Sequence, residues 1–252
     1  MQPIILIPAR LASTRLPNKP LADIGGAPMI VRVWQRAVAA RAGEVVVACD
    51  SDAIRQAVEA AGGKAVLTDP QLPSGSDRIY SALCQLDPEK RYDVVINVQG
   101  DMPLLEPSII VSAAQLLSNP AVDIGTLAAP LQPGEWEEPS VVKVRIQDSG
   151  SGIQEVKQAR AMSFDRSPRL ANHGPRTSFY HHIGIYAYRR SALEKFVSLP
   201  PSANEMREKL EQLRAMDAGM RIDVAVVDTV PLGVDTPEGL EKARQAQAAR
   251  AG

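Results

Sequence analysis

The sequence contains few cysteines: only Cys49 and Cys84 among 252 residues. This number predicts neither a disulfide framework nor a cysteine-based zinc site, and it is typical of proteins in a reducing cytoplasm. No run of apolar residues approaches the roughly 20 needed to span a bilayer. The opening residues MQPIILIPAR lack the basic segment that precedes the apolar stretch of a signal peptide. We therefore expect a cytoplasmic protein without membrane insertion.

Strong charge of one sign is also missing. The formal net charge is -1, which gives no global attraction to nucleic acid or to an anionic membrane. A polyanionic ligand must then be met by a local cluster of Lys and Arg. The sequence contains neither G-x-x-x-x-G-K-[ST] nor G-x-G-x-x-G, so a P-loop and a Rossmann fingerprint are both excluded. No internal repeat or low-complexity linker is present.

Short apolar runs alternate with helical patterns in the first hundred residues. The runs at 4–7, 45–48, 65–67 and 94–98 predict buried strands. Apolar residues at helical spacing predict helices between these strands, the first of them over about 28–41. This order predicts the α/β class, with a doubly wound, mostly parallel sheet in a single domain over 1–252. Ligands bind such sheets at the carboxyl ends of the strands.

The pattern changes after residue 130. The segments 141–146 and 182–188 predict strands, and we expect a smaller mixed or antiparallel sub-region over 130–190. Between these strands, the polar segment 149–178 predicts a loop. Further along, Ser202 opens a capping-box sequence, 222–227 predicts a strand, and Thr236 followed by Pro237 predicts the start of the last helix.

The loop after the first strand carries three cations, Arg10, Arg15 and Lys19. Arg binds phosphate oxygens through two parallel hydrogen bonds and Lys adds a compact charge, so these types suit a triphosphate. A solvated basic loop explains the charge count equally well. Two aspartates, Asp101 and Asp235, follow predicted strands and could converge as Mg²⁺ ligands. The alternative is that each merely caps a turn or precedes a helix.

Six segments together resemble one family. The run IPARLASTRLPNKPLADIGGAPMI at 7–30 is followed by five shorter matches, SGSDR at 74–78, NVQGD at 97–101, HIGIY at 182–186, LEQLR at 210–214 and GVDTP at 233–237. In this combination and order they closely resemble the 3-deoxy-manno-octulosonate cytidylyltransferases, or CMP-Kdo synthetases. The resemblance implies a nucleotide-diphospho-sugar transferase fold and a homodimer with 130–190 in its interface. It also implies CTP-dependent activation of Kdo for lipopolysaccharide biosynthesis.

The resemblance also assigns roles to residues. It implies catalytic roles for Arg10, Lys19, Asp101 and Asp235, and it makes the two aspartates the Mg²⁺ ligands. The nucleotide-binding positions it implies are Ala9, Arg10, Arg15, Lys19, Ser74, Gly75, Arg78 and Gln99. The sugar-acid contacts it implies are His182, Tyr186, Glu211 and Gln212. From their residue types alone, these four could equally be strand, core or solvated helix residues.

One segment departs from the family pattern. The family carries an aromatic-Ser/Thr-Arg-Ala-Thr-x-Pro run whose Arg contacts the sugar carboxylate. Here the segment 156–166 offers Arg160-Ala161 as the nearest match, without the aromatic residue and the proline. Arg160 is therefore the predicted carboxylate contact, with Lys157 and Arg166 as alternatives. The departure leaves open a related sugar acid, an amino-substituted Kdo or a nonulosonate, as the substrate. A non-catalytic sugar-nucleotide binder is a further alternative from a different class.

Overall fold

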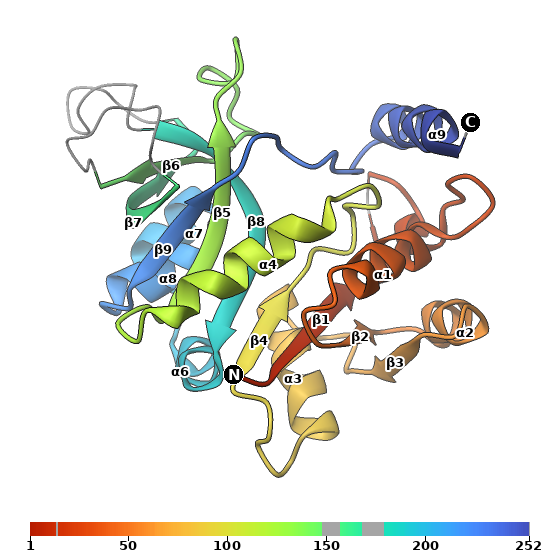
Figure 1. The fold of residues 1–252 in the computed structure, drawn as a ribbon, viewed down its shortest axis with the longest axis horizontal. Helices are drawn as coiled ribbons and strands as arrows, with labels where there is room; N and C mark the ends of the chain where they lie inside the picture. The colour runs from red at the N-terminus through yellow and green to blue at the C-terminus, as the bar shows by residue number, and fades with distance from the viewer. Residues whose placement is uncertain (14, 148–156, 168–178, 252) are drawn as a thin grey trace. The chain divides into compact units, whose positions relative to one another are not determined.

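The structure is a computed structural model that describes residues 1–13, 15–147, 157–167 and 179–251. The chain forms two compact units, one made of Met1–Val111 and Pro231–Gly252 and the other of Ser112–Val230. Both contain strands and helices, which confirms the α/β class (Figure 1). Among the described residues, none of the helices is both long and apolar enough to cross a membrane.

The first unit is built on four parallel strands in the order β3-β2-β1-β4. These are β1 (Pro3–Ala9), β2 (Glu44–Cys49), β3 (Lys64–Leu67) and β4 (Val94–Asn97). The sequence predicted all four, with boundaries within two residues. Ile4 to Ile7 of β1 and all of β4 are buried, as continuous apolar runs require when a strand is covered on both faces.

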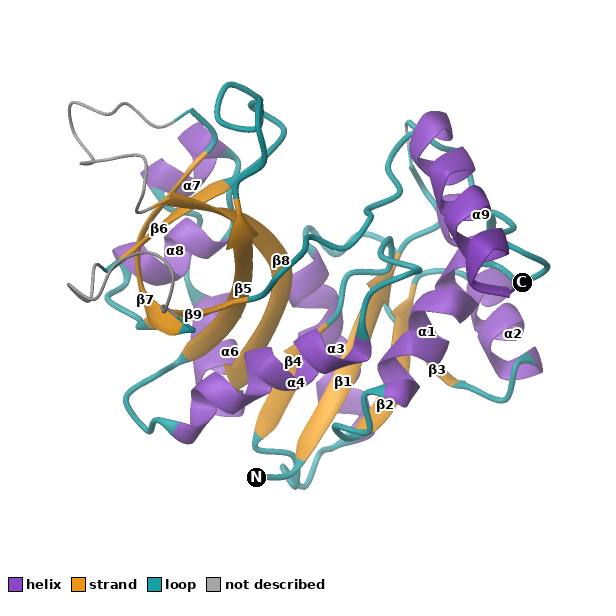
Figure 2. Cartoon of the chain, turned by 45° about the horizontal axis from the view of Figure 1, so that its top comes forward, coloured by secondary structure: helices purple, strands orange, loops and turns teal. Residues whose placement is uncertain are grey.

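Helices cover both faces of these strands. The helices between them are α1 (Met29–Ala39), α2 (Asp52–Ala60) and α3 (Gly75–Leu86). Gly75, at the start of α3, lies against Pro8, whereas Ile7 lies with Ile30 of α1 around Gly100. Because successive strand residues point to opposite faces, α1 and α3 lie on opposite sides of the sheet (Figure 2).

The C-terminal helix α9 (Pro237–Ala251) belongs to the same unit. Thr236 accepts a hydrogen bond from the Gly239 amide at 3.1 Å, so it caps the helix as the sequence predicted. The side chains Val234, Leu240 and Ala243 bury against Ile24 and Met29 in one apolar cluster. Helix α4 (Pro107–Gln115), which the sequence analysis did not predict, runs across the boundary at residue 111.

The second unit has mixed strands. They are β5 (Ile124–Pro130), β6 (Lys143–Ile146), β7 (Gln158–Asp165), β8 (Phe179–Arg189) and β9 (Ile222–Val226). The order is β8-β5-β9-β7-β6, and β6 also pairs with β8, so the pairings close into a ring. Only β5 and β9 run parallel among these described pairs. The mixed region therefore extends beyond the 130–190 expected from the sequence.

The helices described wholly within this unit are short. They are η2 (Leu116–Ser118), α6 (Arg190–Ser198), α7 (Ala203–Glu208) and α8 (Gln212–Asp217). Ser202 and Glu205 form the capping box that the sequence predicted, with hydrogen bonds of 3.2 Å and 3.1 Å. The sequence analysis did not predict β5 or α6, whereas it placed Glu211 and Gln212 on a helix, and Gln212 begins α8.

The predicted loop over 149–178 is wrong for Gln158–Asp165, which form β7. A bulge between Arg145 and Ile146 shifts the pairing of β7 with β6, and both Ala161 and Phe164 are buried. This shift breaks the strict alternation that would identify a half-buried strand in the sequence. The rest of the predicted loop lies largely outside the described residues.

We expect Gly100→Ala to destabilise the protein. A Cβ atom at residue 100 would lie 2.8 Å from the Pro8 carbonyl oxygen and 3.5 Å from Ile30 Cδ1. Backbone cannot yield as a flexible side chain does, so the free energy of unfolding should fall by about 1–3 kcal/mol. Urea denaturation measures this, with Gly233→Ala as the control, because a Cβ atom at residue 233 meets nothing within 4 Å. Equal stability of the two variants would contradict the close approach.

Candidate active site

A cavity of about 310 Å³ opens at the carboxyl ends of β1 and β4 in the first unit. Its walls come from the end of β1, the 3-10 turn η1 (Lys19–Leu21), the start of α3, the loop after β4 and the segment before α9. The lining residues are Pro8, Ala9, Arg10, Lys19, Pro20, Leu72, Pro73, Ser74, Gly75, Arg78, Gln99, Gly100, Asp101 and Asp235. This is the edge at which parallel sheets bind ligands.

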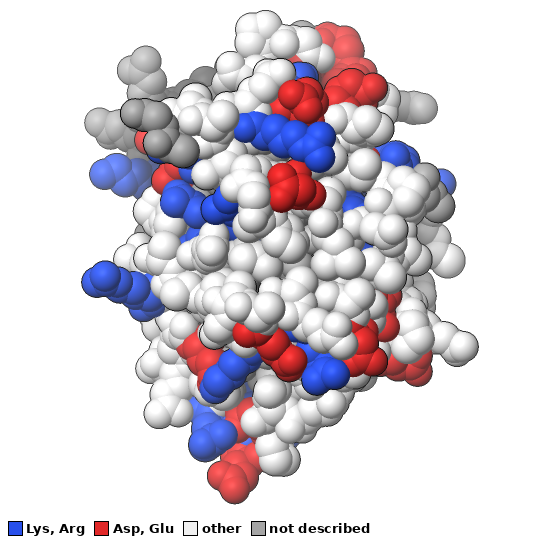
Figure 3. Space-filling model, turned by 90° about the vertical axis from the view of Figure 1, so that its right-hand side faces the viewer, with Lys and Arg blue, Asp and Glu red and all other residues white. Residues whose placement is uncertain are grey.

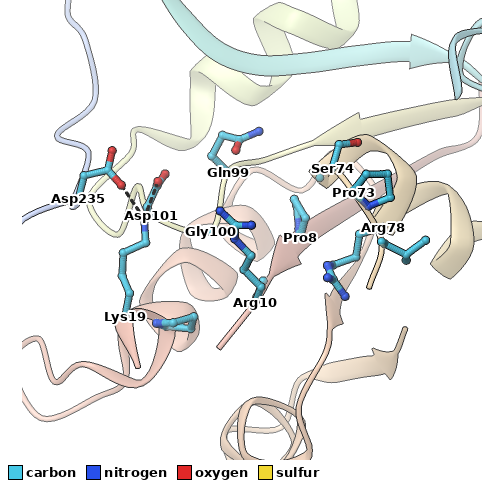
Figure 4. Close-up of a pocket in the computed structure, with 14 residues that line it drawn as sticks. Pro8, Arg10, Lys19, Pro73, Ser74, Arg78, Gln99, Gly100, Asp101 and Asp235 are labelled. Carbon is cyan, nitrogen blue, oxygen red and sulfur yellow. Dashed lines mark hydrogen bonds and ion pairs between the residues drawn. The ribbon is translucent and has the colours of Figure 1, made fainter. Parts of the chain in front are cut away.

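Lys19 joins the two aspartates at this cavity. Its ammonium nitrogen lies 3.0 Å from Asp101 Oδ2 and 2.8 Å from Asp235 Oδ1 (Figure 4). Arg15 adds a second cation, with its guanidinium 3.3 Å from the other oxygen of Asp235. The two carboxylates therefore converge on one point, as the sequence predicted they could. The sequence did not predict that Lys19 would lie between them.

Local backbone structure holds these three side chains together. Asn18 adopts a left-handed conformation (φ 55°) before η1, and the Lys19 amide donates to the Leu16 carbonyl at 3.1 Å. The Val234 amide donates to the carbonyl of Asp101 at 2.9 Å, which ties the segment before α9 to the loop after β4. This bond places Asp235 beside Asp101, and the buried side chain of Val234 anchors the segment in the core.

The electrostatics keep Lys19 and Asp235 ionised. Burial lowers the pKa of Lys19, but the charge of Asp101 and hydrogen bonds to both carboxylates outweigh this effect, so the pKa lies above its usual value. Burial raises the pKa of Asp235, but the hydrogen bond and charge of Lys19 and the charge of Arg15 outweigh it, so that pKa lies below its usual range. At neutral pH, Lys19 is thus a cation and Asp235 an anion.

The charge of the face shown in Figure 3 is mixed rather than concentrated. On the face shown in Figure 3, Lys and Arg alternate with Asp and Glu. Of the cations at or beside the cavity, Arg10, Arg15 and Lys19 belong to the loop after β1 and Arg78 belongs to α3. Arg10 is exposed and lines the cavity, Ala9 is buried in its wall, and Arg15 is exposed beside Asp235. Ala9 and Arg10 thus share the cavity lining with Lys19, and Arg15 shares Asp235 with it.

The opposite wall comes from the start of α3. Ser74 caps this helix, accepting from the Asp77 amide at 3.1 Å. Gly75 leaves room against Pro8, and Gln99 follows β4 with its amide 3.4 Å from the Asn97 side chain. Arg78 also lines the cavity, but its guanidinium is bonded to Thr68 Oγ1 at 2.6 Å and to the Asp69 carbonyl at 3.2 Å. Arg78 is therefore held in place by the protein.

The second unit carries the predicted sugar-acid residues. His182 and Tyr186 lie on β8, with ring centres 5.6 Å apart, and the His182 ring also meets Phe164 at 4.9 Å. Burial, with smaller contributions from Tyr188 and Glu211, raises the pKa of Tyr186 well above its usual value. Glu211 is thus near Tyr186, and Gln212 begins α8 as a buried polar residue.

His182 is a neutral donor. Burial, helped by the neighbouring His181, lowers its pKa to about 3. Its Nε2 lies 3.0 Å from Thr126 Oγ1, and the carbonyls of Ile183 and Ile185 lie 3.2 Å and 2.9 Å from the same oxygen. A hydroxyl has one proton to donate, so when Thr126 donates it to the closer carbonyl, of Ile185, the His182 Nε2–H donates to the Thr126 oxygen.

The three candidate cations for a sugar carboxylate lie in different surroundings. Arg160 is exposed on β7, opposite Asp223 of β9. Lys157 is exposed just before β7. Arg166 donates to the carbonyls of Glu208, Pro139 and Lys209, at 3.0, 3.2 and 3.4 Å. These bonds make Arg166 a structural residue that ties the end of β7 to two other segments, and they argue against it as the carboxylate contact.

Comparison with known proteins identifies the family. A cytidylyltransferase family model matches residues 4–222. A 3-deoxy-manno-octulosonate cytidylyltransferase from Parvibaculum lavamentivorans is 57% identical over 249 residues, covering 98% of this chain and 93% of the relative. The protein of the same name from Methylobacterium nodulans is 58% identical, with 98% of each chain covered. This chain belongs to the 3-deoxy-manno-octulosonate cytidylyltransferase family.

Two solved structures resemble this chain over nearly its whole length. A CMP:2-keto-3-deoxy-manno-octonic acid synthetase solved with CTP matches with a TM-score of 0.86 and 40% identity, over 99% of this chain and 100% of the other. A 4-diphosphocytidyl-2C-methyl-D-erythritol synthase from Anaerococcus prevotii matches with a TM-score of 0.63 at 13% identity, over 98% and 99% of the two chains. This second likeness shows the fold alone.

Sequence reasoning missed several residues of this cytidylyltransferase's cavity. Pro8, Pro20 and Gly100 lie inside motifs that matched the family, but nothing in their residue types indicated a cavity wall. Leu72 and Pro73 lie just outside the nearest motif. Among the predicted nucleotide residues, only Arg15 is not part of the described cavity lining. The ligand contacts assigned to all of these residues stay predictions.

We expect His182 to make the protein less stable in acid. The folded pKa of about 3 lies below the ordinary value of 6.5, so the unfolded state takes up the proton first as the pH falls. Stability is therefore lost below pH 6.5, by about 2 kcal/mol at pH 5. Urea unfolding should show that His182→Gln loses about 2 kcal/mol less than wild type between pH 7 and pH 5. Equal losses would show that His182 is not held neutral.

Proposed function

We propose that this protein transfers the CMP group of CTP to 3-deoxy-manno-octulosonate (Kdo) and releases pyrophosphate. The observation that carries the proposal is the cavity with Lys19, Asp101 and Asp235 in a chain 57–58% identical to enzymes of that name. The CTP-bound relative, which is 40% identical, supports CTP as the nucleotide. Lipopolysaccharide biosynthesis, which needs activated Kdo, is the proposed setting.

The reaction requires no protein nucleophile. The anomeric hydroxyl of Kdo gives its proton to solvent and its oxygen attacks the α-phosphorus of CTP. The bond from this phosphorus to the bridging oxygen breaks, and pyrophosphate leaves in line. The protein contributes position and charge. Arg10, Arg15 and Lys19 would bind the triphosphate oxygens, with Lys19 at the α-phosphate. Ser74, Gly75, Arg78 and Gln99 would enclose the nucleoside at the opposite wall.

The aspartate pair suits Mg²⁺. Asp101 and Asp235 direct carboxylate oxygens to one point, which the Lys19 ammonium occupies in this structure, so Mg²⁺ would bind them with Lys19 turned to the phosphates. Among the described residues, no group of three or more His, Cys, Asp or Glu could hold a metal. Two carboxylates match Mg²⁺ at a substrate site, where phosphates and water complete the shell. When bound, Mg²⁺ would neutralise phosphate charge and lower the pKa of the attacking hydroxyl.

The residues proposed for the sugar acid belong to the second unit. His182 donates to Thr126 and keeps its other ring nitrogen as an acceptor, and Tyr186 and Gln212 add further polar groups suited to sugar hydroxyls. Glu211 would accept from a hydroxyl, and Arg160 is the proposed partner of the carboxylate. We further propose a cytoplasmic homodimer with 130–190 in the interface, and a doubly wound sheet of the nucleotide-diphospho-sugar transferase type.

The departure at 156–166 supports a second candidate. A cytidylyltransferase for a related sugar acid, such as an amino-substituted Kdo or a nonulosonate, would keep the nucleotide cavity and change only the carboxylate contacts. Arg160 is exposed and Arg166 is bonded to backbone carbonyls, so both observations concern the contacts with the sugar carboxylate and not the nucleotide cavity.

Pyrophosphate release tests the proposal directly. We expect rapid release with CTP and Kdo, and release at least a hundredfold slower with ATP or GTP. A wrong base would leave polar groups of the nucleotide site without hydrogen-bond partners, and such a site rejects the wrong base strongly. Amino-substituted Kdo and a nonulosonate complete the panel, with reactions lacking sugar acid as controls. Equal turnover with ATP would refute the cytidylyl assignment, and faster turnover with another acid would replace Kdo. CTP binding without release would favour a non-catalytic binder.

A further inference from the structure

Asp50 lies at the carboxyl end of β2, outside the lining of the cavity. One oxygen of its carboxylate accepts from the Leu11 amide at 2.9 Å, at the start of the loop that carries Arg15 and Lys19. The other oxygen lies 4.0 Å from the Arg78 guanidinium. A single carboxylate thus connects the loop after β1 with α3, which form opposite walls of the cavity.

Arg78 needs this partner because its charge is buried. Its side chain is 4% exposed and that of Asp50 is 9% exposed. The hydrogen-bond acceptors described for Arg78 are the neutral Thr68 hydroxyl and the Asp69 carbonyl. Asp50 is the acidic side chain in the ion pair described for it. A buried guanidinium that loses its counter-ion is strongly disfavoured, so it shifts or draws in water.

The same cluster joins the ends of three strands. Thr68, after β3, donates its hydroxyl to the Cys49 carbonyl at 3.0 Å while accepting from Arg78. Leu11 follows β1, and Asp50 follows β2. The position of Arg78 at the cavity wall is therefore set by groups from β2 and β3, and the loop after β1 is set by the same carboxylate.

We propose that Asp50 is a positioning residue of the nucleotide site. It aligns the loop after β1 through the Leu11 amide, and it holds Arg78 at the cavity wall formed by the start of α3. This inference rests on the proposed function, because it takes the ligand of the cavity to be CTP. The two contacts of Asp50 affect different parts of CTP. The bond to Leu11 concerns the phosphates, and the charge facing Arg78 concerns the nucleoside.

Two substitutions separate these effects. Asp50→Asn keeps one oxygen, which is expected to stay on the close Leu11 amide, and turns a neutral amide toward Arg78. Asp50→Ala removes both partners. Asp52→Asn is the matched control, since Asp52 lies two residues away in an exposed ion pair with Arg55. Binding of CTP and of inorganic tripolyphosphate is measured by titration calorimetry without sugar acid, with circular dichroism as the check of folding.

We expect Asp50→Asn to weaken CTP binding about tenfold while tripolyphosphate binding changes less than about twofold, a loss comparable with one hydrogen bond to a charged group. Asp50→Ala should weaken both ligands, and Asp52→Asn neither. A general loss of structure would weaken the binding of CTP and of tripolyphosphate alike. If Asp50→Ala does not fold, the CTP and tripolyphosphate affinities of Asp50→Asn alone test the proposal.

Wild-type affinities for both probes in the Asp50→Asn variant would overturn the proposal. Equal weakening of both probes in that variant would also overturn it, because the loop and the nucleoside wall would then not be separable through Asp50. If the wild-type protein bound tripolyphosphate and not CTP, the proposed function would fail instead. The tripolyphosphate measurement on Asp50→Ala would still test the bond to Leu11.

Discussion

The ammonium group of Lys19 is bonded to two carboxylates that lie 82 and 216 residues away from it in the chain. The charges of Lys19, Asp101 and Asp235 stay this close only while the backbone fixes all three residues, because ion pairs that are open to solvent are weak. The turn at η1, the loop after β4 and the segment before α9 therefore act as one frame. The bond from Val234 to the Asp101 carbonyl closes that frame.

The parallel strands make the frame possible. Their carboxyl ends lie at one edge of the sheet, so loops that are distant in sequence meet there. Close packing is needed at this edge, as the contact of Gly100 with the Pro8 carbonyl shows. Asp50 and Arg78 likewise connect segments that follow β1, β2 and β3. Charges held rigidly in this way can stabilise a phosphate without reorganising during the reaction.

The sequence predicted the parallel strands and the convergence of Asp101 and Asp235, because buried apolar runs and helix caps are local signals. It did not predict β7, whose bulge breaks the alternation of a strand, or β5 and α6. Apart from this convergence, the contacts between distant segments were not predicted. Lys19 between two carboxylates and Asp50 beneath the cavity arise from topology, and no local spacing encodes them. Arg166 had the right charge for a ligand, but only the structure shows that three carbonyls occupy it.

The most direct test of the account is the magnesium dependence of pyrophosphate release in Asp101→Asn, Asp235→Asn and the double variant. If the two carboxylates act as one unit, each single variant loses most activity, excess Mg²⁺ restores part of it, and the double variant is little worse than the weaker single one. Losses that multiply in the double variant, or full activity of Asp235→Asn at low Mg²⁺, would contradict it. Asp235 would then be a structural residue before the cap of α9.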